Sequence, residues 1–240
     1  MFQADTRTAG YQRWQKLGFL HWRVPRSALR PLIPNELTID EFDGSAWLGL
    51  VPFSMERIRP WWFPAVPGIS WFLETNVRTY VTNQDGMRGV WFFSLDANKQ
   101  LAVSVARTFW HLPYRMAQMS MTIEKPADGF TQFSYRGTRI DTPLAEYDVS
   151  LSVDLSTPAL PAAANSLEHF LVERYVLFAQ KRNGSLMVGQ VHHEPYRIRP
   201  VASCRVSQSL TSAEGGPSLI TPPDHAVYSE GVDVRVSPLK

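Results

Sequence analysis

Segment 107–115 gathers side chains whose types could bind and transform a small acid. It carries Arg107, His111, Tyr114 and Arg115 around the single Pro113. A guanidinium can donate two parallel hydrogen bonds to a carboxylate, which makes arginine a common clamp for organic acids. An imidazole or a phenol held beside the same acid could transfer a proton. The segment therefore predicts a site for a small-molecule organic acid.

A second polar row lies upstream, in the alternating segment 72–81. Alternate residues of a β-strand share one face, so Glu74, Asn76 and Arg78 should point the same way. Large apolar segments flank this row on both sides, and buried charges are generally paired or functional. We therefore expect the row to face segment 107–115 across an internal pocket.

Two sets of site residues follow from this arrangement. The candidates for proton transfer are Glu74, Tyr114 and His111. The candidates for binding the substrate are Arg107, Arg115, Arg78 and Asn76.

Each assignment has a structural alternative. The polar row could be a self-paired face in solvent. Arg107 and Arg115 could form ion pairs with Glu74 in a network that binds nothing. Tyr114 could be a hydrogen-bonded core residue rather than a general acid. The residues alone leave these alternatives open.

His192 and His193, followed by Glu194, invite comparison with a metal site. Adjacent residues on a strand point to opposite faces, so only one of these histidines could join His21 or His111. The spacing matches no zinc motif. We therefore predict no metal and no cofactor.

Composition argues against several classes of protein. A net charge of +2, with 44% hydrophobic and 19% charged residues, is ordinary for a soluble globular chain and gives no case for nucleic-acid or membrane binding. Residues 1–14 contain no apolar core of a signal peptide, and no stretch approaches the ~20 apolar residues of a membrane helix. The single cysteine, Cys204, excludes an intrachain disulfide and favours a cytoplasmic location. The sequence neither predicts nor excludes a homo-oligomer.

The abundance of aromatic residues and prolines favours many short strands and frequent turns. Apolar or alternating runs predict strands or extended segments at 15–24, 37–40, 46–53, 71–81, 89–96, 117–124, 130–139, 147–155, 187–193 and 196–210. The tail, 211–240, is rich in Ser, Gly and Pro and could add an edge strand at 227–236.

Helical signals occur at three places. A short helix begins after Pro25, and apolar spacing predicts a second helix over 98–110. A third should begin at Asn165, with Glu168 completing a capping box, and end at 183–184.

Segment 55–69 concentrates Trp61, Trp62 and Phe63 among prolines and cannot be regular structure. These aromatics could cover the mouth of a pocket. We favour their packing onto the core, because large aromatic side chains mostly bury area.

No repeat or low-complexity block divides the chain. We therefore expect a single domain over 1–240, with the tail the least certain part. Its predicted class is mainly β, an antiparallel barrel or cone with two or three flanking helices.

Several motifs resemble those of the YqjF-like family, a bacterial domain family of unknown function. They occur in the same order over nearly the whole chain up to about Val201: His21–Val24, Leu32–Pro34, Asp43–Trp47, Pro52–Phe53, Glu74–Val81, Gly89–Ala97, Leu112–Tyr114, Glu173–Tyr175 and His192–His193.

That family in turn resembles acetoacetate decarboxylase, which implies a β-barrel or cone around a deep pocket. Segment 28–41 is similar to the N-terminal region of the decarboxylases, and Glu74 falls where they carry an active-site glutamate. Their Schiff-base lysine is replaced by Tyr114 in this chain, and Gln15 lies near the place of their active-site arginine. A Schiff base needs a primary amine, so decarboxylation through an iminium is not expected.

Two functions remain. The first is an enzyme that performs acid–base chemistry on a small keto or hydroxy acid without a Schiff base. The second is a non-catalytic ligand-binding or purely structural β-barrel domain.

Overall fold

The computed structural model describes residues 7–100, 103, 110–126, 129–181 and 183–240. Strands make up most of it, which confirms the predicted mainly β class. They are β1 (Gly10–Val24), β2 (Thr38–Ile39), β3 (Ala46–Pro60), β4 (Phe72–Thr82), β5 (Arg88–Ala97), β6 (Tyr114–Glu124), β7 (Thr131–Arg139), β8 (Glu146–Val153), β9 (Leu160–Pro161), β10 (Val176–Gln180), β11 (Leu186–His192), β12 (Arg197–Pro200), β13 (Ser203–Gln208) and β14 (His225–Val236). The helical segments are short: α1 (Arg26–Leu29), the 3-10 turn η1 (Arg30–Leu32), α3 (Leu167–Val172) and α4 (Leu210–Ala213).

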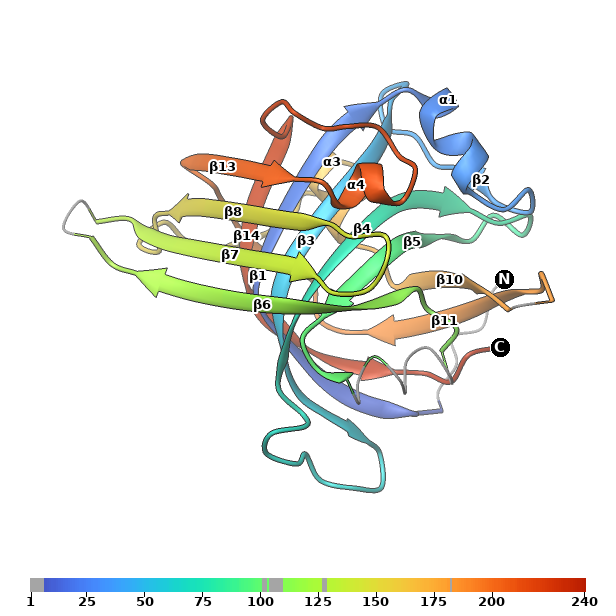
Figure 1. The fold of residues 1–240 in the computed structure, drawn as a ribbon, viewed down its shortest axis with the longest axis horizontal. Helices are drawn as coiled ribbons and strands as arrows, with labels where there is room; N and C mark the ends of the chain where they lie inside the picture. Colours follow the sequence, from blue (N-terminus) through green and yellow to red (C-terminus); the bar gives the residue numbers. More distant parts are fainter. Residues whose placement is uncertain (1–6, 101–102, 104–109, 127–128, 182) are drawn as a thin grey trace.

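The main sheet closes into a ring. Its strand order β5-β10-β11-β14-β1-β3-β4 returns to β5, because β4 and β5 are also paired (Figure 1). Most pairings are antiparallel, as expected, but β5 runs parallel to both β10 and β6. β10 pairs with β5 near Val90, and β6 pairs with it near Leu95, so the sheet forks along this one strand. From the fork, β6, β7, β8 and β13 extend as a wing.

Two large apolar cores follow from this fork. One lies inside the ring and includes Leu17, Phe19 and Phe53. The other joins ring residues such as Leu50 to wing residues such as Phe133. Because side chains alternate between the faces of a strand, each ring strand can contribute to both cores.

β14 is not the edge strand that the tail pattern suggested. It lies between β1 and β11, and its pairing with β1 extends from His21↔His225 to Gly10↔Val236. The reason is topological, because closing the ring requires a strand between β1 and β11. A strand's apolar pattern does not report which neighbours it will have.

The third predicted helix is much shorter than expected and begins one residue later. α3 ends at Val172, and its cap is Ser166, whose side chain accepts a hydrogen bond from His169 N. Asn165 precedes the cap with a left-handed φ of 65°. The apolar run that suggested further helix forms β10 instead, because it can pair with both β11 and β5. Tertiary pairing thus overrides helical spacing.

The aromatic segment also differs from expectation. β3 continues to Pro60 with a bulge near Arg57, whose φ is 52°, so Met55–Pro60 belongs to a strand. Beyond it, the β3–β4 loop projects from the body at the bottom of Figure 1. Trp61 and Trp62 are 63% and 67% exposed, so the prediction that these aromatics pack onto the core is wrong.

Most of the helix predicted over 98–110 lies outside the described residues. In the described part of the chain, no helix is both long and apolar enough to cross a membrane.

Candidate functional site

A cavity of about 720 Å³ occupies the interior of the ring. One face of β4 forms part of its wall through Phe72, Glu74, Asn76 and Arg78. The polar row therefore points into a common space, as its alternation predicts. Residues of β1, β3, β5 and the start of β6 complete much of the remaining wall.

Glu74 and Tyr114 meet inside this cavity. Tyr114 Oη donates a hydrogen bond of 2.7 Å to Glu74 Oε2, and Glu74 is only 3% exposed. Burial raises the pKa of Glu74 to about 8, while the hydrogen bond from Tyr114 opposes this rise and the nearby Asp96 adds to it. Burial and the Glu74 carboxyl both raise the pKa of the Tyr114 phenol well above its ordinary value. At neutral pH the pair is therefore mostly a neutral carboxylic acid and a neutral phenol.

The fork in the sheet is what positions Tyr114. β6 begins at this residue, directly after Pro113, and pairs in parallel with β5 through Leu95↔Tyr114. Leu95 N also donates a 3.1 Å hydrogen bond to Pro113 O. These backbone links hold the phenol beside β4, within hydrogen-bond reach of Glu74.

Arg78 and Asn76 bring further polar atoms to the cavity. Arg78 Nη2 donates to Leu171 O at 3.0 Å, but Arg78 Nε and Asn76 Oδ1 are buried without a hydrogen-bond partner among the described residues. Gly49 lies opposite Arg78 on β3. A Cβ at Gly49 would lie 3.4 Å from Arg78 Cγ and 3.1 Å from His21 Cδ2, so the glycine gives both side chains room.

Arg174 is a cavity residue that the sequence did not reveal. Its Nε donates to Phe170 O at 2.7 Å, and its Nη1 pairs with Asp40 Oδ2 at 2.8 Å. Its Nη2 is buried without a partner among the described residues. The pair with Asp40 also gives Arg174 a structural role. Its access to the cavity depends on the chain leaving α3 at Val172, which the sequence pattern did not indicate.

Arg115 and His111 lie outside the residues that line the cavity. Tyr114 and Arg115 are neighbours on β6, so their side chains point to opposite faces and cannot both enter it. Arg115 Nε instead lies 3.7 Å from Glu214 Oε1. His111 has a left-handed φ of 50° just before β6. Arg107 lies outside the described residues.

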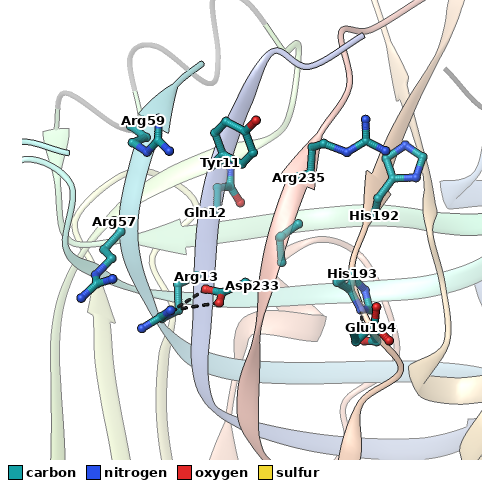
Figure 2. Close-up of a pocket in the computed structure, with 11 residues that line it drawn as sticks. Tyr11, Gln12, Arg13, Arg57, Arg59, His192, His193, Glu194, Asp233 and Arg235 are labelled. Carbon is teal, nitrogen blue, oxygen red and sulfur yellow. Dashed lines mark hydrogen bonds and ion pairs between the residues drawn. The ribbon is translucent and has the colours of Figure 1, made fainter. Parts of the chain in front are cut away.

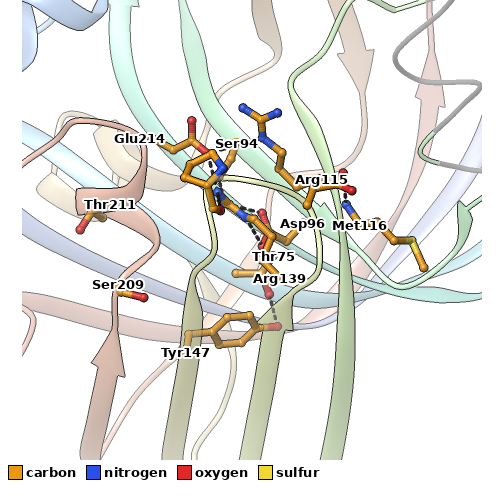
Figure 3. Close-up of polar contacts among 12 residues, drawn as sticks. Thr75, Ser94, Asp96, Arg115, Met116, Arg139, Tyr147, Ser209, Thr211 and Glu214 are labelled. Carbon is orange, nitrogen blue, oxygen red and sulfur yellow. Dashed lines mark hydrogen bonds and ion pairs between the residues drawn. The ribbon is translucent and has the colours of Figure 1, made fainter.

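The opposite faces of β5 and β6 carry a separate ion-pair network (Figure 3). Arg139 donates to Asp96 through Nη2 at 2.8 Å and Nε at 3.0 Å. Its Nη1 donates to Glu214 Oε1 at 2.7 Å, and its Nη2 also reaches Ser94 Oγ at 3.0 Å. Arg115 therefore belongs to the neighbourhood of this network rather than to the cavity.

Apart from its polar row, the cavity is bounded mainly by apolar side chains. They include Leu17, Phe19, Phe53, Met55, Phe92 and Leu95. Trp62 and Ile69 of the projecting loop also line it, so part of the exposed aromatic segment belongs to its mouth.

A second hollow of about 580 Å³ adjoins this mouth and shares Tyr11, Gln12 and Arg59 with the cavity. Figure 2 shows arginines on β1, β3 and β14 along its sides. Arg13 is already bound to Asp233, with Nε 2.6 Å from Oδ1. Both signs of charge are therefore present in this second hollow.

The histidines form a pair that the sequence did not suggest. His21 Nδ1 lies 3.1 Å from His225 Nδ1, and His21 Nε2 lies 2.8 Å from Tyr80 Oη. Burial lowers the pKa of His21 well below its ordinary value. His192 and His193 lie on or just beyond β11 instead. The described residues contain no group of three or more His, Cys, Asp or Glu that could hold a metal ion.

Solved structures with a similar fold include acetoacetate decarboxylases and an enzyme of enduracididine biosynthesis. An acetoacetate decarboxylase-like enzyme from Sphingomonas wittichii RW1 superimposes with a TM-score of 0.67 at 12% identity, covering 98% of this chain and 93% of that one. An acetoacetate decarboxylase gives 0.60 at 15% identity, covering 98% and 89%. The enduracididine biosynthesis enzyme MppR, complexed with pyruvate, gives 0.65 at 11% identity, covering 99% and 92%. At such low identity the likeness shows the fold alone.

Sequence comparison is more specific. The uncharacterised protein YqjF of Bacillus subtilis is 36% identical over 232 residues, covering 95% of this chain and 90% of that protein. Residues 11–233 match the model of a family described as uncharacterised conserved proteins, DUF2071. The YqjF resemblance read from the motifs is thereby confirmed, and the chain belongs to the DUF2071 family.

Proposed function

We propose that the cavity binds an organic acid, and that Glu74 and Tyr114 exchange protons with it. The observation that carries this proposal is the buried Arg78 guanidinium, whose Nε has no partner among the described residues, on the wall that also holds Glu74. A keto or hydroxy acid supplies both an anion for Arg78 and an oxygen for Glu74.

The charges in the cavity favour an anionic ligand. A buried cation is costly unless it is paired, and no carboxylate of the described residues forms an ion pair with Arg78. The raised pKa keeps Glu74 mostly neutral at pH 7, so it would not repel a carboxylate held nearby. Asn76 Oδ1 offers a free acceptor, which suits the hydroxyl of a hydroxy acid.

The same raised pKa suits Glu74 to proton transfer. A general acid or base is most effective when its pKa lies near the working pH. Tyr114 already donates to Oε2 of Glu74, which leaves Oε1 to carry the acidic proton toward a bound carbonyl or hydroxyl oxygen. Tyr114 would hold the carboxyl in place and stabilise the carboxylate that forms when the proton leaves.

A Schiff base plays no part in this proposal. The five lysines are all described, and none lines the cavity. Arg115 and His111 do not line it either, so we give them no role in binding or proton transfer. The role of Arg107 stays a prediction. The single cysteine and the ordinary composition favour the cytoplasm as the location.

The decisive experiment is binding of pyruvate, acetoacetate, lactate and longer keto and hydroxy acids, measured by isothermal titration calorimetry. Arg78→Gln should weaken binding of the best acid by about 1.5–3 kcal/mol, the range for a hydrogen bond to a charged group. Arg136→Gln is the matched control, because Arg136 forms an exposed ion pair with Asp148 on the wing. The proposal fails when the two variants bind alike or when no acid binds to the wild type.

A further inference from the structure

We infer that the acid bound here has a long apolar body, such as a straight-chain or aryl-substituted keto or hydroxy acid, and is not a three- or four-carbon keto acid. This inference rests on the proposed function and names the class of its ligand. It combines the size of the cavity, the separation of its polar and apolar walls, and the apolar residues at its mouth.

The cavity is far larger than a small keto acid. At roughly 30 Å³ per water-sized group, a keto acid of about six or seven non-hydrogen atoms would occupy only about 200 Å³. The cavity measures about 720 Å³, within the range of sites that enclose a ligand of drug size. A small acid alone would leave most of the space to water held against apolar walls, where it finds few hydrogen-bond partners.

The cavity wall has a polar part and an apolar part, which also favours a ligand with a long apolar body. The polar row of β4, with Tyr114 and Arg174, supplies the groups that can hold a carboxylate. Around them, β1, β3 and β5 contribute side chains such as Phe19, Phe53 and Phe92, which have no atom that can hydrogen-bond to a carboxylate. A ligand that satisfies both parts has one anionic end and an apolar remainder.

The mouth of the cavity extends this apolar wall to the surface. Trp62 is 67% exposed and Ile69 is 45% exposed, and both line the same cavity. Ile58 of β3 lines it as well. An apolar ligand tail too long for the interior would therefore meet Trp62 and Ile69 at the exit, beside the polar Gln12 and Arg59.

The first test measures the affinity of purified wild-type protein for acetate, butanoate, hexanoate, octanoate, decanoate and dodecanoate, below the concentrations at which they aggregate. Burying one methylene should tighten binding by about fourfold until the cavity is full. The expected result is an affinity that rises through the series to at least octanoate. Equal affinity for butanoate and decanoate overturns the inference.

A variant at the mouth then tests where the alkyl chain of the ligand lies. Ile58→Trp adds bulk at the mouth without touching the polar row, so it should weaken decanoate by tenfold or more and leave butanoate unchanged. Ile123→Trp on exposed β6 is the control with the same change of size, and it should alter neither. A loss for decanoate and butanoate alike in Ile58→Trp would count against the placement, and the wild-type series decides independently should this variant fold poorly.

Decanol, the neutral counterpart of decanoate, separates this inference from the proposed function. Decanoate bound tenfold or more tighter than decanol, with a rising series, supports both. A flat series in which Arg78→Gln still abolishes acid binding overturns only the long apolar body. Equal affinity for decanol and decanoate overturns the acid function and with it this inference.

Discussion

Each face of the β4–β5 pair has a buried carboxyl group and a buried guanidinium. On one face the two groups form an ion pair, and on the other face they do not. On the outer face, Asp96 and Arg139 are buried and joined by two hydrogen bonds, and Arg139 also reaches Glu214. On the inner face, Glu74 and Arg78 are also buried, yet neither has an ion-pair partner among the described residues. A fully paired network stabilises one arrangement, whereas unpaired groups around a cavity are available to a ligand. Pairing, rather than burial, therefore distinguishes the candidate site.

The largest expected effect comes from breaking the outer network. Arg139→Met should destabilise the protein by about 3–5 kcal/mol, because it leaves the buried Asp96 carboxylate uncompensated. Arg78→Met should lower the stability far less, because it leaves no buried carboxylate without its partner. Urea denaturation of both variants at pH 7 makes the comparison. Similar losses would mean that Arg78 is also structural. Replacing Asp96 together with Arg139 by apolar residues should recover much of the stability.

A second effect follows from the raised pKa of Glu74. Its folded-state pKa of about 8 exceeds its unfolded value of about 4.3, so the folded state binds the proton more tightly. The stability from this group is fully present below the unfolded pKa and is lost as the pH rises toward 8, by about 1.4 kcal/mol per pH unit within that window.

Glu74→Gln removes this dependence and nothing else that titrates. The variant minus wild-type difference in unfolding free energy should therefore grow by roughly 2–3 kcal/mol between about pH 5.5 and about pH 7.5. Denaturation curves at several pH values measure it, and taking the difference cancels the buried histidines. A constant difference across this range would show that Glu74 is already ionised.

The smallest effect concerns Tyr114. Tyr114→Phe removes one buried hydrogen bond and should cost about 0.5–1.5 kcal/mol. Because that bond lowers the pKa of Glu74, its loss should raise this pKa further and extend the pH-dependent window upward. Carboxyl NMR titration of Glu74 in both proteins tests the shift. Tyr11→Phe, at an exposed ring, serves as the stability control. An unchanged or lower Glu74 pKa would contradict the assigned bond.

Local sequence patterns predicted where the strands lie more reliably than which strands pair with each other. The alternation in segment 72–81 placed Glu74, Asn76 and Arg78 on one face before any partner strand was known, because strand periodicity is a property of a single segment. The pairing of β10 and the central place of β14 depend instead on closure of the ring. The apolar spacing of β10 also matches a helix, and only its pairing with β11 and β5 makes it a strand.

For the site, the sequence by itself determined that no lysine stands where Tyr114 lies and that a carboxyl and a guanidinium share the face of one strand. Only the tertiary structure decided which other groups join them. The fork at β5 brings Tyr114 to Glu74 and turns Arg115 toward Glu214, and the early end of α3 brings Arg174 to the cavity. The physical reason is that periodicity fixes the face of a side chain from its neighbours in sequence. Its partners and its pKa depend on segments 40 or more residues away, as the Glu74–Tyr114 pair illustrates.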